Sequence, residues 1–256
     1  MNNAAASLEI LFAPGEFAAL AGRDLGDTTC VVFDVFRATS TIVTALANGA
    51  ATVVPVAEIA DALALRRQRP EILLAGERDG LRIRAALTGG VDFDFGNSPR
   101  EFTPGRVAGK TIVLTTTNGS RALRACAGAR EVLVASFLNL GATAAHLRSH
   151  RAGRLLLVCS GTGEQAAYED VLGAGALVES LWAGSGREAA DSARIARRIY
   201  LSHQHDLLAA VSDSSNGRRL LSQPDLRDDV PLCLERDRFP ILARMKQGEV
   251  RCGQAS

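Results

Sequence analysis

The feature that most constrains the fold is a pattern that occurs three times: an apolar run typical of a β-strand, a polar turn, and a segment with apolar residues at helical spacing. The first copy begins with the β-branched run at residues 31–35, and its helical segment stops at Asn48. The runs at residues 111–114 and 154–159 start the other two copies. Strands that alternate with helices indicate right-handed crossovers and parallel strands. We therefore predict an α/β fold with a largely parallel sheet flanked by helices in α/β/α layers.

Shorter patterns complete the expected chain path. Further strands are expected at residues 8–13, 51–56, 72–75 and 131–135, and helices at residues 58–69, 139–150, 169–181 and 189–210. Residues 81–106 have no clear period, and an irregular stretch of this length inside a domain is more often functional than idle. We expect residues 1–256 to form a single catalytic unit, with residues 239–256 as a peripheral tail. Two lobes that divide near residues 105–130, with a cleft between them, are the alternative.

The composition excludes several classes of function. The chain has 29 Lys and Arg against 28 Asp and Glu, and 5% of its residues are aromatic, so no basic surface or stacking platform for nucleic acid is indicated. The five cysteines are widely spaced without a Cys-x-x-Cys pair, which argues against disulfides and structural zinc and favours a reducing cytoplasm. No stretch approaches the roughly 18 consecutive apolar residues of a membrane span. We expect a cytoplasmic protein that binds neither nucleic acid nor membrane; the oligomeric state stays open, a homo-oligomer included.

The polar turn of the first copy brings together groups that bind phosphate. Asp34 is expected at the carboxyl end of a buried strand, and Arg37 and the hydroxyls of Thr39, Ser40 and Thr41 follow at the start of a helix. A helix N-terminus favours an anion, and a guanidinium can hold one with two hydrogen bonds. Because a carboxylate lies beside a phosphate only when a cation separates them, the turn indicates a metal-bridged phosphate. A capped helix with an internal Asp–Arg pair carries equal weight as an alternative.

Acidic and hydroxyl side chains also follow the other predicted strands. Because the carboxyl ends of parallel strands meet at one edge of a sheet, we expect these groups to lie together. Carboxylates, phosphate oxygens and water are the ligands that Mg²⁺ prefers, and one or two protein carboxylates usually suffice. The candidate ligands are Asp34, Glu77, Asp79, Glu164, Glu169 and Asp170.

Other chemistries fit the sequence less well. The turn at residues 161–166 matches the Gly-x-Gly-x-x-Ala dinucleotide fingerprint, but the second strand with its acidic residue is missing, so nicotinamide binding is a minor alternative. Cys159 has no Arg in the loop after it, which argues against a cysteine phosphatase. His146 and His150 share a helical face without a third ligand nearby and are expected on a solvated surface.

Five separated motifs occur in a distinctive order. They are Asp34-Val-Phe-Arg-Ala-Thr-Ser-Thr41, Gly76-Glu-Arg78, Phe95-Gly-Asn-Ser-Pro99, Thr115-Thr-Thr-Asn-Gly-Ser-Arg121, and Ser160-Gly161 followed by Glu169-Asp170. Together they resemble the 2-phosphosulfolactate phosphatase family over about residues 10–237, and Asn216-Gly-Arg-Arg-Leu220 with Asp229-Val230 is a weaker piece of the same resemblance. Phe36 and the tail after residue 239 depart from the family pattern. The resemblance implies a Mg²⁺-dependent phosphatase that converts 2-phospho-3-sulfolactate to 3-sulfolactate, a step of coenzyme M biosynthesis, with its site in a cleft of an α/β fold.

Residue chemistry and resemblance together give a specific hypothesis. Asp34 with Asp170 or Glu169 holds Mg²⁺ against the ester phosphate, Arg37 and the turn at residues 39–41 neutralise its other oxygens, and Glu77 orients the attacking water. The substrate is a small phosphorylated, sulfonated acid, and alternatives are a phosphatase for another small phospho-hydroxyacid or a phosphometabolite-binding protein without turnover. The expected substrate-binding residues are Thr39, Ser40, Thr41, Arg78, Asn97, Ser98, Thr115, Thr117, Asn118, Gly119, Ser160 and Gly161. For the sulfonate and carboxylate end, the candidates are Arg78, Arg82, Asn97, Ser98 and Asn118.

Overall fold

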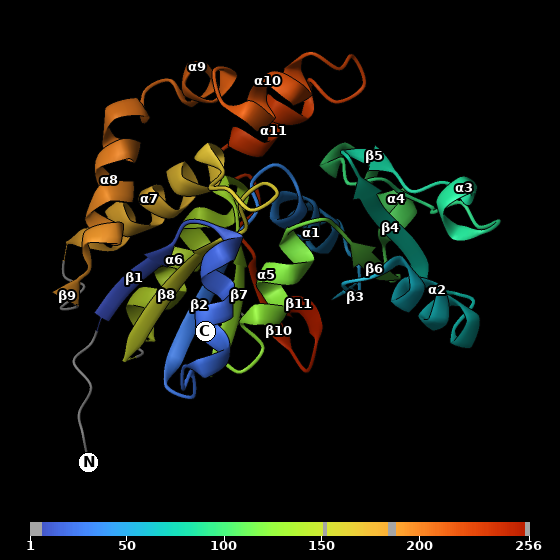
Figure 1. The fold of residues 1–256 in the computed structure, drawn as a ribbon, viewed down its shortest axis with the longest axis horizontal. Coiled ribbons are helices and arrows are strands. Elements are labelled where there is room, and N and C mark those ends of the chain that lie inside the picture. Colours follow the sequence, from blue (N-terminus) through green and yellow to red (C-terminus); the bar gives the residue numbers. More distant parts are fainter. Residues whose placement is uncertain (1–6, 151–152, 184–187, 254–256) are drawn as a thin grey trace.

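The computed structural model describes residues 7–150, 153–183 and 188–253, and within these ranges it forms one mixed sheet with helices on both faces (Figure 1). The strand order is β5-β4-β6-β3-β11-β10-β7-β2-β8-β1-β9. The strands are β1 (Ser7–Leu11), β2 (Thr28–Phe33), β3 (Thr52–Pro55), β4 (Leu73–Arg78), β5 (Leu81–Arg82), β6 (Thr111–Thr115), β7 (Glu131–Ala135), β8 (Arg154–Cys159), β9 (Glu188–Ala189), β10 (Leu242–Lys246) and β11 (Glu249–Gly253).

Helices connect most pairs of strands that are consecutive along the chain, as the alternating sequence pattern predicts. The α-helices are α1 (Ala38–Ala47), α2 (Ile59–Gln68), α3 (Ala85–Thr88), α4 (Pro104–Val107), α5 (Gly119–Ala125), α6 (Leu140–Ser149), α7 (Tyr168–Trp182), α8 (Asp191–His203), α9 (Leu207–Ser212), α10 (Ser215–Leu221) and α11 (Asp229–Leu234), and the 3-10 helices are η1 (Pro14–Gly22), η2 (Pro99–Glu101) and η3 (Phe137–Asn139). Among these described elements, no helix is both long and apolar enough to span a bilayer.

The predicted fold class is confirmed. Strand β2 pairs in parallel with both β7 and β8, β8 pairs in parallel with β1, and β6 pairs in parallel with β3 and β4. In β2, Val31 and Phe33 pack into one hydrophobic cluster, while Cys30 and Val32 pack into another cluster that includes residues of α1 and α5. A strand that is buried on both faces needs a continuous apolar run, and all six residues of β2 are buried. The carboxyl end of β2 is therefore fixed from both sides.

The end of the chain is part of the sheet. Strands β10 and β11 form an antiparallel hairpin, in which β10 pairs with β7 and β11 pairs with β3. The hairpin thus joins the parallel strands β4, β6 and β3 to the parallel strands β7, β2, β8 and β1. The expectation of a peripheral tail at residues 239–256 is wrong for residues 242–253, because hydrogen bonding to two distant strands overrides their short and charged sequence pattern.

The C-terminal helices lie across the carboxyl edge of the parallel strands (Figure 1). Helix α8 packs closely on α7: a Cβ atom at Gly175 would lie 2.2 Å from the carbonyl oxygen of Ala196, so only glycine permits this approach. Helices α9, α10 and α11 pack on one another, and α11 also contacts η2 and η3. These helices form a cover above the strand ends, where the polar turns lie.

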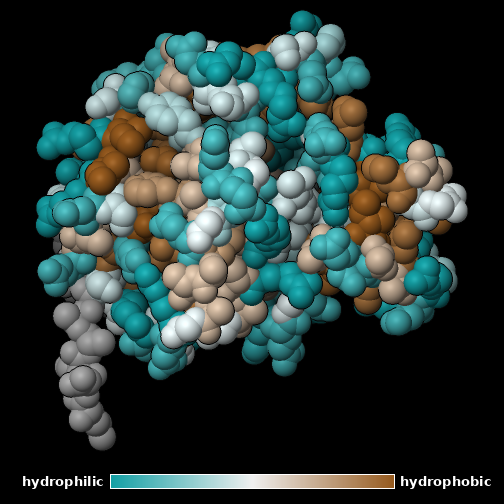
Figure 2. Space-filling view, in the orientation of Figure 1, coloured by the Kyte–Doolittle hydropathy of each residue, from teal (hydrophilic) through white to brown (hydrophobic). Residues whose placement is uncertain are grey.

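The irregular stretch at residues 81–106 is ordered by apolar anchors. The rings of Phe95 and Phe102 stack with centroids 4.8 Å apart, and the Arg106 guanidinium lies 4.1 Å from the Phe95 centroid. Figure 2 shows apolar side chains over this part of the molecule, where Leu81 and Leu87 are exposed. The stretch therefore forms a fixed wall beside β4.

Candidate active site

A cavity of about 340 Å³ opens at the carboxyl edge of the sheet, under the C-terminal helices. Strand ends β2, β4, β6 and β8 supply most of its wall, and α10 closes the opposite side. The residues that line it are Asp34, Phe36, Arg37, Glu77, Asp79, Gly80, Asn97, Thr116, Thr117, Asn118, Gly161, Thr162, Gly163, Asn216 and Arg219. Three acidic and two basic side chains thus face a small space.

Asp34 lies where β2 turns into α1. Its Oδ1 accepts a hydrogen bond from the backbone N–H of Ala38 at 2.9 Å, and its own N–H donates to Thr39 Oγ1 at 3.0 Å. Helix α5 starts against the same carboxylate, because a Cβ at Gly119 would lie 2.6 Å from Asp34 Oδ2. The side chain is therefore held in one orientation by α1 and α5, with its carboxylate in the cavity wall.

Arg37 is part of a buried ion pair. Its Nη1 donates to Asp229 Oδ2 at 2.7 Å and its Nη2 donates to the carbonyl of Gly80 at 2.9 Å, while both charged side chains are at most 3% exposed. The other oxygen of Asp229 accepts from Ser98 Oγ at 2.6 Å and from Arg100 Nε at 2.8 Å. An internal Asp–Arg pair does exist, as one alternative predicted, but the partner of Arg37 is Asp229 from α11 rather than Asp34.

Glu77 connects two loops of the site. Its Oε1 accepts from both the N–H and the hydroxyl of Thr117, at 2.8 and 2.9 Å, and its Oε2 accepts from the N–H of Gly80 at 2.8 Å. These bonds tie the turn after β4 to the turn after β6. Glu77 is buried, and it lines the cavity.

The loop after β8 is fixed from two directions. Asn118 donates through Nδ2 to the carbonyls of Ser160 and Gly163, both at 2.9 Å. Asp170, at the start of α7, accepts from the N–H of Val35 at 2.7 Å and from the N–H of Gly161 at 3.1 Å. Residues from four separate turns are therefore joined by direct hydrogen bonds at one edge of the sheet.

Three carboxyl groups at this edge are buried close to one another. Burial raises the pKa of Asp34 to about 7, and the charges of Glu77 and Glu169 add to this effect. Burial also raises the pKa of Glu169, and it raises the pKa of Asp170 well above its ordinary value, with further contributions from the charges of Asp34 and Glu169. Acidic groups that repel each other in a buried site are stabilised by a cation, so the electrostatics suit a positively charged ligand.

A divalent cation fits this donor set with few protein ligands. The described part of the chain contains no cluster of three or more His, Cys, Asp and Glu side chains arranged to hold a metal ion. Mg²⁺ typically uses one or two carboxylates and completes its shell with water and phosphate oxygens, so such a cluster is not required. Within the described residues, the buried Oε2 atom of Glu169 has no hydrogen-bond partner, which leaves one acceptor available near Asp34.

The structure places some of the predicted site residues in the lining of the 340 Å³ cavity. Asp34, Arg37, Glu77, Asp79, Asn97, Thr117, Asn118 and Gly161 line it. The remaining predicted residues are outside this lining: Thr39, Ser40, Thr41, Arg78, Arg82, Ser98, Thr115, Gly119, Ser160, Glu164, Glu169 and Asp170.

Several predicted residues outside the lining have their polar groups engaged elsewhere. Ser40 Oγ donates to the carbonyl of Val35 at 2.9 Å, and Thr41 Oγ1 donates to the carbonyl of Asn97 at 2.9 Å. The Arg78 guanidinium donates to the carbonyl of Glu77 at 2.7 Å and to the hydroxyl of Thr115 at 3.1 Å. The hydroxyls thus build the turn that holds Asp34 and Arg37, and Arg78 builds the wall behind Glu77.

Asn216 and Arg219, both from α10, line the cavity, and the sequence reasoning missed them as site residues. They are three residues apart on one helix face, and Arg219 Nη2 donates to Asn216 Oδ1 at 3.2 Å. Asn216 Nδ2 donates to Glu169 Oε1 at 2.6 Å and to Thr162 Oγ1. The only sequence signal for them was the weaker motif at residues 216–220, because α10 follows no strand.

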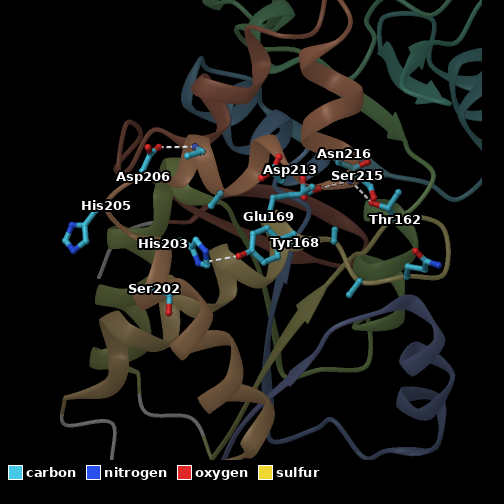
Figure 3. Close-up of a pocket in the computed structure, with 16 residues that line it drawn as sticks. Thr162, Tyr168, Glu169, Ser202, His203, His205, Asp206, Asp213, Ser215 and Asn216 are labelled. Carbon is cyan, nitrogen blue, oxygen red and sulfur yellow. Dashed lines mark hydrogen bonds between the residues drawn. The ribbon is translucent and has the colours of Figure 1, made fainter.

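A second, larger cavity of about 820 Å³ lies on the other side of Asn216 and Thr162 (Figure 3). Helices α7, α8 and α9 line it, with Tyr168 and His203 on one wall, where the Tyr168 hydroxyl lies 3.3 Å from His203 Nδ1. Glu169 belongs to this lining. The Thr162–Asn216–Glu169 hydrogen bonds therefore form the partition between the two cavities.

Fold and site together define an α/β protein with a buried acidic cavity at the carboxyl edge of its sheet. A family model described as 2-phosphosulpholactate phosphatase matches residues 18–248. Proteins named "Probable 2-phosphosulfolactate phosphatase" are 38% identical over 234 residues in Caldanaerobacter subterraneus subsp. tengcongensis (91% of this chain, 93% of the relative) and 40% identical over 220 residues in Thermotoga petrophila (86% and 90%). The relative of that name from Gloeobacter violaceus is 40% identical over 222 residues (86% and 89%). The chain belongs to the 2-phosphosulfolactate phosphatase family, which confirms the resemblance seen in its five motifs.

Proposed function

We propose that this protein is a Mg²⁺-dependent phosphoric monoester hydrolase that converts 2-phospho-3-sulfolactate and water to 3-sulfolactate and phosphate. The observation that carries the proposal is the cavity in which Asp34, Arg37 and Glu77 meet in a chain of this family. A phosphate, a carboxylate and a sulfonate on one small substrate need positive charge around them. Arg37 already has Asp229 as a counterion, and the lining carries three acidic side chains against two basic ones, so a bound cation would help the cavity to accept such an anion.

Asp34, with Glu169 or Asp170, would hold the divalent cation, which when bound offsets negative charge on the phosphoryl oxygens. Arg37 would donate its remaining N–H groups to those oxygens, since Asp229 and the carbonyl of Gly80 keep its guanidinium in place. Glu77 would orient the attacking water, with both of its oxygens held by Thr117 and Gly80. Catalysis would rest on positioning and electrostatics.

The raised pKa values of two buried cysteine thiols agree with direct attack by water rather than by a thiolate. Burial raises the pKa of the Cys159 thiol well above its ordinary value, and burial raises the pKa of Cys233 to about 12. A thiol is a strong nucleophile only as a thiolate, so these side chains are unsuited to form a phosphoryl-enzyme intermediate. The place of the reaction in coenzyme M biosynthesis and a cytoplasmic location are further parts of the proposal, and they rest on the resemblance and on the cysteine content.

The test measures phosphate release from 2-phospho-3-sulfolactate by the purified chain, with EDTA and after Mg²⁺ is restored. We expect release that EDTA abolishes and Mg²⁺ recovers. Phosphate release that EDTA does not reduce would contradict a requirement for a divalent metal ion. Faster turnover of 2-phospholactate would point to another phospho-hydroxyacid as the substrate. Substrate binding without release would favour a phosphometabolite-binding protein.

A melting experiment tests the metal without activity. In metal-free buffer at pH 8, Mg²⁺ is expected to raise the Tm of the wild type, because a ligand that binds only the folded state stabilises it. The Asp34→Asn variant is expected to show a much smaller rise. Equal rises in both proteins would remove Asp34 from the metal site.

A further inference from the structure

The substrate proposed above has an acid group at the end away from its phosphoester, and the two arginines expected to bind that end lie outside the cavity lining. Arg78 and Arg82 are not among the residues that line the 340 Å³ cavity. Arg78 bonds to Glu77 and Thr115, and Arg82 Nη1 bonds to the carbonyl of Asp94 at 3.2 Å. The sulfonate therefore requires a different cationic partner.

The two basic residues of the cavity wall, Arg37 and Arg219, differ in how much of their hydrogen-bonding capacity is used. Arg37 is 3% exposed and has a carboxylate partner in Asp229 at 2.7 Å. Arg219 is half-buried, and the one hydrogen bond found for its guanidinium among the described residues is the neutral bond to Asn216 Oδ1 at 3.2 Å. Arg219 thus presents a cation with several free N–H donors to the cavity.

Both guanidinium groups approach Gly80. Arg37 Nη2 donates to its carbonyl at 2.9 Å, and a Cβ atom at Gly80 would lie 2.5 Å from Arg219 Nη1. Two cations directed at one residue repel each other unless an anion lies between them or beside them. At this end Asp229 bonds to Arg37, and Glu77 Oε2 accepts from the N–H of Gly80 at 2.8 Å. Among the described residues no carboxylate is hydrogen-bonded to Arg219, so Arg219 can still bind a negatively charged ligand group.

The position of Arg219 is set by the partition between the two cavities. Asn216 accepts from Arg219 through Oδ1, while its Nδ2 donates to Glu169 at 2.6 Å. Glu169 is 1% exposed, so this chain of hydrogen bonds anchors an accessible arginine to the buried start of α7. A side chain that is oriented before a ligand arrives loses less entropy on binding, which suits a residue that selects among ligands.

We propose that Arg219 is the specificity-determining residue that binds the sulfonate of the substrate, beside Gly80, while the phosphoester lies toward Asp34. This inference rests on the proposed function. Guanidinium groups bind planar or tripodal oxyanions with two hydrogen bonds, which a lysine cannot reproduce. Arg219 acts in binding, so its loss raises KM far more than it lowers kcat.

The first experiment compares two substrates that differ in the sulfonate alone, 2-phospho-3-sulfolactate and 2-phospholactate. For R219M we expect an increase of about 10- to 100-fold in KM for the sulfonated substrate, an almost unchanged kcat, and an unchanged kcat/KM for 2-phospholactate. R219K should recover part of the loss. R218M is the matched control, because Arg218 is the adjacent residue, is exposed and lines neither cavity. An equal loss for both substrates, or no loss, overturns the proposal.

The second experiment separates this proposal from the proposed hydrolysis. Calorimetry measures binding of 3-sulfolactate, which has no phosphate, to the wild type, R219M and R218M. Tighter binding to the wild type and to R218M than to R219M supports the sulfonate subsite even if no phosphate is released from any substrate. Equal binding to all three proteins, or no binding to any of them, overturns the subsite, while phosphate release by the wild type would still support the hydrolase.

Discussion

Arg37 and Asp229 form an ion pair of 2.7 Å between residues 192 positions apart, and both side chains are almost fully excluded from solvent. The pair joins the turn after β2 to α11 in the C-terminal cover. Asp229 also accepts from Ser98 and Arg100, so it joins the irregular stretch beside β4 to the same point. One carboxylate thus fixes three segments around the cavity.

Replacing Asp229 with Asn is expected to destabilise the protein strongly. The variant leaves the buried Arg37 cation without its counterion, which costs about 3–5 kcal/mol. Asp228→Asn is the matched control, because its side chain is 63% exposed and its loss should change stability by at most about 0.5 kcal/mol. Urea unfolding measures both values. Similar midpoints for the two variants would show that the buried pair contributes little.

Replacing Arg37 with Lys is expected to lower kcat about 100- to 1,000-fold in a folded protein. A lysine keeps the positive charge, but its single nitrogen cannot occupy both the Nη1 position that bonds to Asp229 and the Nη2 position that bonds to Gly80. Arg100→Lys is the control, since Arg100 donates to the same Asp229 from a half-exposed position outside the cavity lining. Steady-state kinetics compare them. If R37K loses no more turnover than R100K, Arg37 does not act on the phosphate.

Asp34 is expected to make stability depend on pH when divalent cations are absent. Burial raises its pKa to about 7, whereas a carboxyl in the unfolded chain titrates near pH 4. Between these values the folded state holds a proton that the unfolded state has released. The contribution of this proton to the free energy of unfolding is therefore complete below about pH 4 and is lost as the pH rises toward 7.

Asp34→Asn removes that titration and can still accept the hydrogen bond from Ala38. Unfolding in urea with EDTA at pH 4.5, 6 and 8 should therefore show the stability of the wild type falling relative to D34N as the pH rises. The surface variant D228N controls for a change in net charge. Parallel stability curves for the wild type and D34N would contradict a raised Asp34 pKa.

Gly119→Ala is expected to disturb the site through Asp34. The new Cβ would lie 2.6 Å from both Asp34 Oδ2 and Ala38 Cβ, so the carboxylate or the start of α5 must move, at a cost of about 1–3 kcal/mol. A clear fall in kcat should accompany the loss of stability. Gly128→Ala is the control, because no atom lies within 4 Å of its added Cβ. Normal kcat in G119A would show that the position of Asp34 is not critical.

The sequence by itself determined the strands, the polar turns and their common edge. Patterns of period 2 and period 3.6 are local properties of the sequence. The run of residues 31–33 before Asp34 therefore predicts a buried strand that is followed by a helix. Parallel connection then places Asp34, Glu77, Asn118 and Gly161 at one edge, and the structure puts all four in the same cavity wall.

Only the tertiary structure decided what closes the site and which polar groups remain free in it. The partner of Arg37 lies in α11, Asn216 and Arg219 come from α10, and the β10–β11 hairpin enters the sheet between β3 and β7. These contacts join residues that are far apart in the chain, so no local pattern encodes them. A hydroxyl at a turn or an arginine in a motif can bond inward or face a ligand, and packing of distant segments decides between the two.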